Sequence, residues 1–146
     1  MAIDSKHWPQ VGVGVAVWRG DEVLLVKRGT EPWKGQWSLP GGRQQPRETV
    51  REAAIREVIE ETGLTVTPAT LIDVVDSITY SKDGCIQYHY TLVDFGAEWQ
   101  AGDACAGDDA VDVCWMRLDE LDGLDMWDET RRIVRLSFSQ RAEGLG

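Results

Sequence analysis

The sequence predicts one domain of the α/β or α+β class, and two observations carry this prediction. Short segments rich in β-branched residues are interleaved with two longer segments of helical character. No internal repeat or linker divides the 146 residues, a length that suits one domain with a sizeable core. We therefore expect residues 1–146 to fold as a single domain of strands and two helices.

The first elements expected are the two strands of a β-hairpin. Residues 11–18 alternate small and β-branched side chains, 22–28 read EVLLVKR, and Arg19-Gly20-Asp21 between them is typical of a turn. A loop is expected at 29–35, because it contains a proline and two glycines, and a short strand is expected at 37–39. These segments lead the chain to a pair of adjacent glycines.

A helix is predicted between Pro46 and Gly63. Proline fits the first turn of a helix, where its missing N–H does no harm, and glycine fits the position just past the last turn. The rest of the chain predicts more strands and a closing helix. The expected order is a β-rich segment at 64–75, a hairpin of 78–80 and 86–95, a loop at 100–109, a strand at 110–116, a short turn at 118–121 and a helix at 126–141.

The composition narrows the classes of function. Hydrophobic residues make up 42% and charged residues 27%, which is typical of a globular chain. The formal net charge of -10 argues against non-specific binding to nucleic acid or to an anionic membrane surface, because both need a basic protein surface. A small polyanionic substrate stays compatible with this charge if a metal cation lies between substrate and protein.

The cysteines and histidines also exclude some kinds of site. Three cysteines occur in no CxxC spacing, and only two histidines are present, so a disulfide framework, a zinc site and a Ser-His-Asp triad are all poorly supported. The N-terminal residues contain no apolar run typical of a signal peptide, and no stretch approaches the roughly 20 apolar residues of a membrane span. We expect a cytoplasmic protein.

Three glutamates crowd into five positions of the predicted helix: Glu57, Glu60 and Glu61. At about 100° per residue they fall within a sector of about 100°, so they are expected to share one face. Val58 and Ile59 fall on the opposite side and are expected to hold the helix against the core. Like charges this close repel each other, which requires an explanation.

Two interpretations compete for this acidic face. An amphipathic helix with a solvated, glutamate-rich outer face is common and needs no ligand. Alternatively, carboxylates one helical turn apart can ligate a hard cation such as Mg²⁺ or Mn²⁺, which converts repulsion into coordination. The neighbouring residues favour the cation. Gly41 and Gly42 allow a backbone free of side chains, or one with positive φ, where phosphate oxygens can approach, and Arg56 lies beside Glu57 to orient or compensate it.

The spacing of these residues resembles the Nudix box, G-x5-E-x7-R-E-U-x-E-E-x-G-U, where U is aliphatic. The segment GQWSLPGG at 35–42 and the segment WMRLDEL at 115–121 also resemble this family outside the box. The likeness covers most of residues 11–121. Every fixed position of the box is satisfied, by Gly42, Glu48, Arg56, Glu57, Val58, Glu60, Glu61, Gly63 and Leu64.

The resemblance implies an α/β/α sandwich around a mixed β-sheet. It further implies a metal-dependent hydrolase of a nucleoside diphosphate linked to another group, with Mg²⁺ or Mn²⁺ as cofactor. Carried over position by position, it implies metal ligands at Glu57, Glu60 and Glu61, with contributions from Glu48 and from the carbonyl of Gly41 or Gly42.

The same resemblance implies roles in catalysis. Arg56 would orient the acidic cluster, and Glu57 or Glu61 is the first choice for the base that accepts a proton from water. Many family members carry a glutamate on a distant loop, where this chain has aspartates. The candidates for a base or ligand outside the box are therefore Asp108, Asp109 and Asp112.

Substrate contacts are expected from residues around the box. Arg28 is a candidate for a phosphate contact, although an ordinary solvated charge is the alternative. Trp33 lies on a proline-containing loop and could stack on a base or a sugar, and Gly42 would let a phosphate approach the backbone.

The substrate expected first is a nucleoside diphosphate sugar such as ADP-ribose, because residues 23–64 resemble ADP-ribose pyrophosphatases. Two alternatives stay open. One is a nucleoside triphosphate pyrophosphohydrolase that cleanses the nucleotide pool, and the other is a regulatory module that binds a nucleotide without hydrolysis. Many relatives are dimers, so a homodimer stands beside a monomer.

Overall fold

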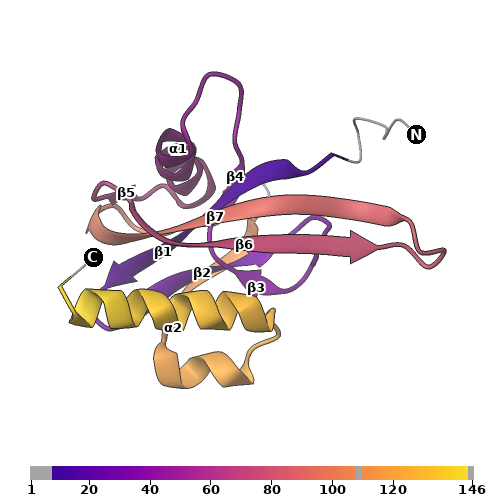
Figure 1. Ribbon diagram of the computed structural model, residues 1–146. Helices are drawn as coiled ribbons and strands as arrows, with labels where there is room; N and C mark the ends of the chain where they lie inside the picture. Colours follow the sequence, from indigo (N-terminus) through magenta and orange to yellow (C-terminus); the bar gives the residue numbers. More distant parts are fainter. Residues whose placement is uncertain (1–7, 108–109, 145–146) are drawn as a thin grey trace.

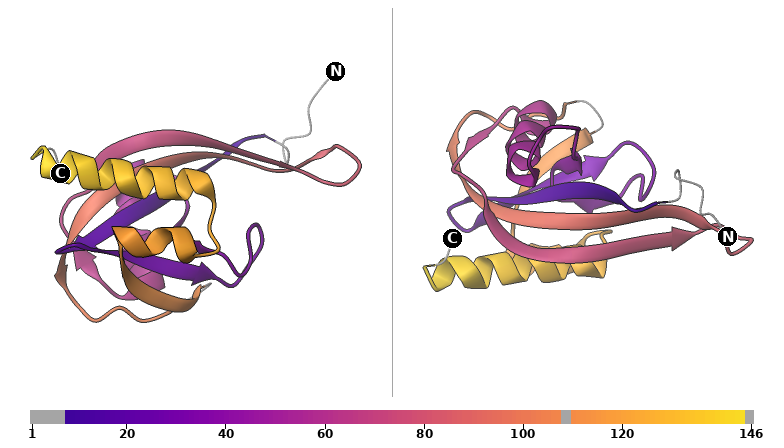
Figure 2. Two further views of the ribbon diagram at one scale, coloured as in Figure 1. Left: turned by 90° about the horizontal axis from the view of Figure 1, so that it is seen from below. Right: turned by 45° about the horizontal axis from the view of Figure 1, so that its top comes forward.

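The computed structural model describes residues 8–107 and 110–144 and shows three layers (Figure 1). A mixed β-sheet lies between α1 (Val50–Thr62) on one face and α2 (Asp128–Ala142) on the other, and two further views show the same layering (Figure 2). This confirms the expected α/β/α sandwich. The strands are β1 (Gln10–Arg19), β2 (Glu22–Arg28), β3 (Trp37–Ser38), β4 (Gly41–Arg43), β5 (Thr65–Val66), β6 (Thr70–Tyr80), β7 (Ile86–Ala101) and β8 (Ala110–Arg117). A 3₁₀ helix at Leu118–Gly123 precedes α2.

Strand β1 lies at the centre of the sheet. It runs parallel to β7, from the pair Gln10 and Tyr90 to the pair Trp18 and Glu98, and antiparallel to β2 and β4. Strand β6 pairs with β7, and β8 pairs with β2. Because helices cover both faces, β1 is buried continuously from Gly12 to Trp18 instead of alternating between buried and exposed positions.

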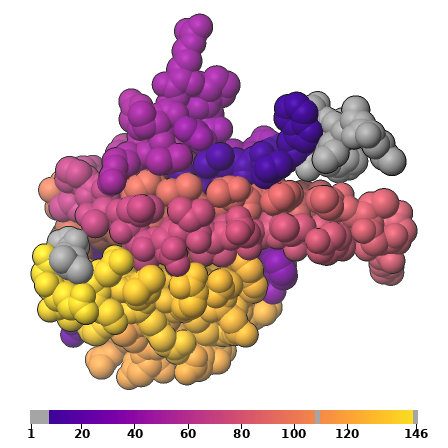
Figure 3. Space-filling model, viewed as in Figure 1, coloured from indigo at the N-terminus to yellow at the C-terminus, as the bar shows by residue number. Residues whose placement is uncertain are grey.

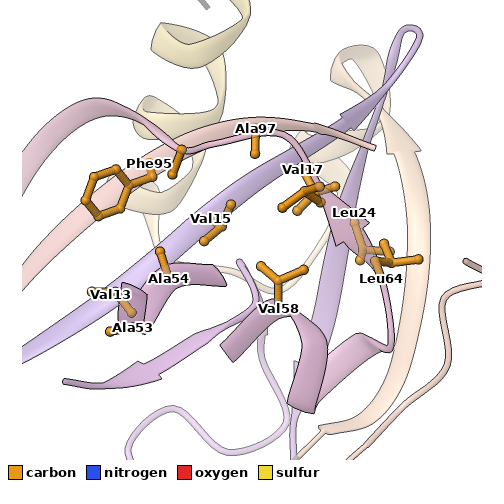
Figure 4. Close-up of a cluster of buried hydrophobic side chains, with 12 residues drawn as sticks. Val13, Val15, Val17, Leu24, Ala53, Ala54, Val58, Leu64, Phe95 and Ala97 are labelled. Carbon is orange, nitrogen blue, oxygen red and sulfur yellow. The ribbon is translucent and has the colours of Figure 1, made fainter. Parts of the chain in front are cut away.

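Two hydrophobic cores form, one on each face of the sheet. The core under α1 takes Val13, Val15 and Val17 from β1 together with Val58 of α1 (Figure 4). The core under α2 takes side chains that β1 points the other way, including Trp18. Its indole N–H donates a hydrogen bond of 2.9 Å to the Ser137 hydroxyl of α2, which satisfies the one polar atom of a fully buried ring.

Capping residues set the ends of α1. The Thr49 hydroxyl accepts a hydrogen bond from the backbone N–H of Glu52, and the Glu52 carboxylate accepts one from the N–H of Thr49. This reciprocal pair is a capping box, and it starts the helix after Pro46 and not at it. Gly63 ends the helix with φ of 78°, in the left-handed region that glycine adopts easily, as the sequence predicts.

The buried face of α1 differs from the expected one. Ala53, Ala54 and Val58 are fully buried, whereas Ile59 is 53% exposed, so the expectation that Ile59 holds the helix against the core is wrong. The small alanines let the helix lie close to the sheet and turn it so that Ile59 lies at the edge of the contact. The same rotation brings Glu61 to the buried side, where only 9% of the residue is exposed.

Strands β6 and β7 extend beyond the rest of the sheet as a hairpin, visible in the space-filling view (Figure 3). Strand β7 continues to Ala101, six residues past the predicted end at 95, because β1 and β5 supply partners along that stretch. No helix among the described residues is long and apolar enough to cross a membrane.

Candidate active site beside the adjacent glycines

The adjacent glycines form strand β4 and not a loop. Gly41 and Gly42 pair with Gly14 and Val13 of β1. A Cβ on Gly41 would lie 1.9 Å from the Val13 carbonyl oxygen, and a Cβ on Gly42 would lie 2.5 Å from the Glu57 carboxyl. The two positions therefore require glycine because other groups approach closely, and not because of a positive φ.

Two glutamates of α1 lie against this glycine pair. The backbone N–H of Gly41 donates a 3.0 Å hydrogen bond to the Glu61 carboxylate. The Glu57 carboxyl packs on Gly42, and its side chain is only 16% exposed. Strand β4 and α1 are thus joined through the acids themselves, and the two carboxylates converge on a backbone surface without side chains.

Arg56 connects the other acids of the helix. Its guanidinium donates to the Glu48 carboxylate at 2.7 and 2.8 Å, to Glu57 at 2.9 Å and to Glu60 at 3.0 Å. It also donates to the carbonyl of Arg43 at 3.0 Å. The positive charge of Arg56 thereby offsets the repulsion among the carboxylates of Glu48, Glu57 and Glu60. This explains how the crowded glutamates are tolerated before any metal binds.

This network shifts the acid strength of its members. The hydrogen bond from Arg56, assisted by the backbone N–H of Gln45, lowers the pKa of Glu48 to about 2. In turn the Glu48 carboxylate raises the pKa of Arg56 above its ordinary value. Glu48 and Arg56 therefore both stay charged across the physiological pH range.

The donor set of this face fits a hard divalent cation. Carboxylate oxygens and a peptide carbonyl are the ligands that Mg²⁺ and Mn²⁺ prefer. Within residues 8–107 and 110–144, no three acidic, histidine or cysteine side chains converge on one point. Mg²⁺ is commonly held by one or two carboxylates together with water and substrate phosphates, so the pair Glu57 and Glu61 beside Gly41 suits it. Glu60 is more exposed, at 46% of its side chain.

Two of the three predicted substrate residues lie at or near the loop between β2 and β3: Arg28 is the last residue of β2, and Trp33 lies on the loop itself. The Arg28 side chain donates a 2.7 Å hydrogen bond to the Pro32 carbonyl, so it braces this loop. The Trp33 ring, 36% exposed, stacks on Trp127 with centroids 5.9 Å apart and planes 16° apart. Only Gly42 among these three lies directly against the acids.

Of the three aspartates proposed from outside the box, the structure describes only Asp112. Asp108 and Asp109 lie outside the described residues. Asp112 of β8 pairs with Lys27 of β2, and its carboxylate raises the pKa of the Cys114 thiol, after the larger effect of burial. Cys114 packs with the core under α2, so Asp112 lies on the face of the sheet opposite to α1.

Sequence reasoning missed the contact between the 102–107 segment and the end of α1. The Gly107 N–H donates to the Glu61 carbonyl at 2.9 Å, and the Cys105 N–H donates to the Thr62 carbonyl at 3.1 Å. A Cβ on Gly107 would lie 2.7 Å from the Glu60 carbonyl oxygen, so this glycine is also a close-approach position. The glycines of this loop were the one signal for such packing, and they do not indicate which partner they approach.

Known proteins resemble this chain in sequence, and solved structures resemble it in fold. The family model described as NUDIX domain matches residues 8–136. An ADP-ribose pyrophosphatase from Methanocaldococcus jannaschii is 35% identical over 113 residues, covering 77% of this chain and 64% of the relative. The chain thus spans slightly less than two thirds of that protein. A nucleoside triphosphatase NudI from Salmonella arizonae is 32% identical over 118 residues, covering 77% of this chain and 82% of NudI.

The fold is likewise found among solved structures. A MutT NUDIX hydrolase from Burkholderia pseudomallei superposes with a TM-score of 0.75 at 30% identity, covering 88% of this chain and 98% of that one. The two sequence relatives carry names for different substrates, one a nucleotide sugar and the other a nucleoside triphosphate. All three names describe hydrolytic enzymes, but they do not agree on a substrate.

Proposed function

We propose that this chain, which belongs to the NUDIX family, hydrolyses a pyrophosphate bond. The proposed substrate is a nucleoside diphosphate linked to a sugar, with ADP-ribose as the first candidate. The observation that carries this proposal is the placement of Glu57 and Glu61 against the backbone of Gly41 and Gly42. A diphosphate needs both a cation and an unobstructed backbone, and this surface offers ligands for the one and room for the other.

Each acid of the site has a distinct part in this proposal. Glu57 and Glu61 hold the cation, with Glu60 and the carbonyl of Gly41 as further ligands. Glu48 acts through Arg56, which holds the carboxylates in place. A bound Mg²⁺ or Mn²⁺ would neutralise the diphosphate and lower the pKa of a bound water.

The chain's own carboxylates also handle the proton. Glu57 or Glu61 accepts it from the attacking water, because both lie against the surface where the diphosphate would bind. Asp108 and Asp109 stay as alternative bases, since they directly follow Gly107, which is bonded to the Glu61 carbonyl. Asp112 is a weaker candidate because it lies on the opposite face of the sheet.

Trp33 is the proposed contact for the base or the sugar. Its ring is partly exposed and is braced from behind by Trp127, so one face of a rigid aromatic surface is available for stacking. Arg28 acts on this contact indirectly, because it holds the Pro32 carbonyl one residue before Trp33.

A substrate screen with Mg²⁺ or Mn²⁺ tests the proposal. Release of AMP from ADP-ribose should exceed release of pyrophosphate from nucleoside triphosphates by a clear margin in kcat/KM. A preference for triphosphates would support the second candidate, for which the likeness to NudI is the reason. Asp76→Asn, which removes the charge of an exposed acid on β6, is the matched control for the Glu57→Gln and Glu61→Gln variants.

The non-catalytic alternative requires a different outcome. A binding module would retain nucleotide affinity but show no turnover with either class of substrate. If Glu57→Gln and Glu61→Gln left turnover unchanged, the assignment of these residues would fail even though the reaction stood. We propose a cytoplasmic protein acting on a small-molecule nucleotide, with a homodimer as one of two states that light scattering would distinguish.

A further inference from the structure

One row of residues crosses the sheet and ends at the glycine pair. By strand register, Asp73 of β6 faces Asp94 of β7, Asp94 faces Gly14 of β1, and Gly14 faces Gly41 of β4. Neighbouring strands lie about 4.8 Å apart, so two spacings, or about 10 Å, separate the backbones of Asp94 and Gly41. Gly41 in turn donates its N–H to Glu61.

Asp94 is a buried carboxyl that the proposed reaction does not use. Only 7% of the residue is exposed, and it forms no hydrogen bond with the described parts of the chain. Its Oδ1 atom lies 2.5 Å from the point where a Cβ on Gly14 would lie. The Cβ of Leu39 lies 3.7 Å from the same point, so the carboxyl fills the space between β1 and the segment that leads into Gly41.

The charges around Asp94 come from two elements. Asp73 of β6 faces it across the strand pair, and Arg132 of α2 lies near both, bonded to Asp73 at 3.1 Å and to Glu129 at 2.8 Å. Strand β1 and the residues before Gly41 contribute Gly14 and Leu39, which carry no charge. Burial first, and Asp73 second, raise the pKa of Asp94 to about 7, while Arg132 opposes them.

We propose that Asp94 is a positioning residue whose charge state is transmitted through Gly14 to the contact between Gly41 and Glu61. When the carboxyl is protonated, it stays packed on the Gly14 backbone and supports Leu39. When it is ionised, Asp73 repels it and it recruits water, which loosens its contact with Gly14 and Leu39. Strand β4 then shifts relative to Glu61. The consequence for turnover rests on the proposed function, whereas the movement of β4 does not.

The movement is tested without substrate or metal, by following backbone amide NMR shifts from pH 5.5 to 8.5. In the wild-type protein the amides of Gly14, Leu39 and Gly41 should titrate together, and Asp94→Asn should abolish this step. Asp73→Asn should move the midpoint to lower pH, and Arg132→Gln should move it to higher pH, because each removes one charge that acts on Asp94. Asp76→Asn should leave the midpoint unchanged.

Turnover supplies the second measurement. Dividing kcat of Asp94→Asn by kcat of the wild type at each pH cancels the titration of all other groups. This ratio should rise by at least about twofold across the same step, because asparagine mimics the protonated side chain. A merely structural role would change the ratio by the same factor at every pH.

The outcomes separate the two proposals. If the three amides do not titrate near neutrality, or titrate equally in Asp94→Asn, the positioning role is overturned. A flat kcat ratio beside a clear amide step would overturn the link to turnover. Absence of hydrolysis with every nucleotide tested would overturn the proposed function, while the amide titration would still decide the role of Asp94.

Discussion

Two carboxylates, Glu48 and Asp94, lie on different sides of the sheet in opposite surroundings. Glu48 receives two hydrogen bonds from Arg56 and one from the backbone of Gln45, and its pKa falls to about 2. Asp94 receives no hydrogen bond within the described chain, and burial raises its pKa to about 7. The charge on a carboxylate therefore depends on whether donors accompany it out of water.

The two sides of the sheet differ in the ionisation state of these carboxyl groups. Before α1, the hydrogen bonds from Arg56 keep the Glu48 carboxylate ionised. Under α2, the sheet contains a carboxyl that is partly neutral at physiological pH. The stability contributions have opposite signs. Glu48 stabilises the fold fully above about pH 4.5 and loses this contribution as the pH falls toward 2, whereas Asp94 destabilises the fold as the pH rises toward 7.

The largest expected effect is on turnover in Glu57→Gln and Glu61→Gln. Each change keeps the shape of the side chain but removes a negative charge from the surface beside Gly41 and Gly42. We expect kcat/KM to fall by about 10²- to 10³-fold, in line with the loss of one electrostatic contact in other active sites. Steady-state kinetics with ADP-ribose measures this. A fall in kcat/KM of less than about threefold in both variants would contradict the assignment of Glu57 and Glu61 to the active site.

Arg56→Lys should have the next largest effect. Lysine keeps the charge but cannot donate to three carboxylates in fixed directions, so the acids lose their orientation. We expect a fall of about 10- to 100-fold in turnover with an unchanged circular dichroism spectrum. Arg51→Lys on the same helix is the control, and an equal loss there would point to general disturbance of α1.

Asp94→Asn should stabilise the protein at high pH. The folded pKa of about 7 exceeds the ordinary 3.8, so the wild type loses stability as the pH rises between these values. The difference corresponds to about 4 kcal/mol for a rigid site, and relaxation reduces it to about 2 kcal/mol. Urea unfolding at pH 5 and pH 8 measures the change. An equal free energy difference between variant and wild type at both pH values would contradict the raised pKa.

The smallest effect is expected for Ile59→Ala, at less than about 0.5 kcal/mol of unfolding free energy. Its side chain lies at the exposed edge of α1, while Val58 beside it is fully buried. Val58→Ala should therefore cost about 2 kcal/mol. Thermal unfolding of the two variants compares them directly. Similar losses of stability in both would indicate that Ile59 packs in the core.

The sequence predicted which residues share α1 better than it predicted how this helix packs on the sheet. Spacing alone placed Arg56 and the glutamates on one helix, because fixed offsets along a helix become fixed directions. The rotation of that helix about its axis was not predictable, since it depends on how closely Ala53 and Ala54 approach the sheet. The expectation for Ile59 failed for this reason.

The α2 side offered no local signal of its buried carboxyl. Asp94 lies in a strand whose sequence does not mark this acid as buried. Its burial depends on Gly14, 80 positions earlier in the chain. The sequence placed Gly14 in the strand expected at 11–18, but it did not indicate which group approaches this glycine. Long-range register determines such contacts, and one sequence does not encode it in any local pattern.

In the proposed reaction, the carboxylates beside Gly41 and Gly42 bind a divalent cation and promote attack of water on a pyrophosphate bond. The most direct test is AMP release from ADP-ribose by the wild type and by a Glu57→Gln, Glu61→Gln double variant at the same Mg²⁺ concentration, with a chelator as a further arm. We expect release in the wild type that both the chelator and the double substitution abolish. Equal rates in all three arms would contradict the claim.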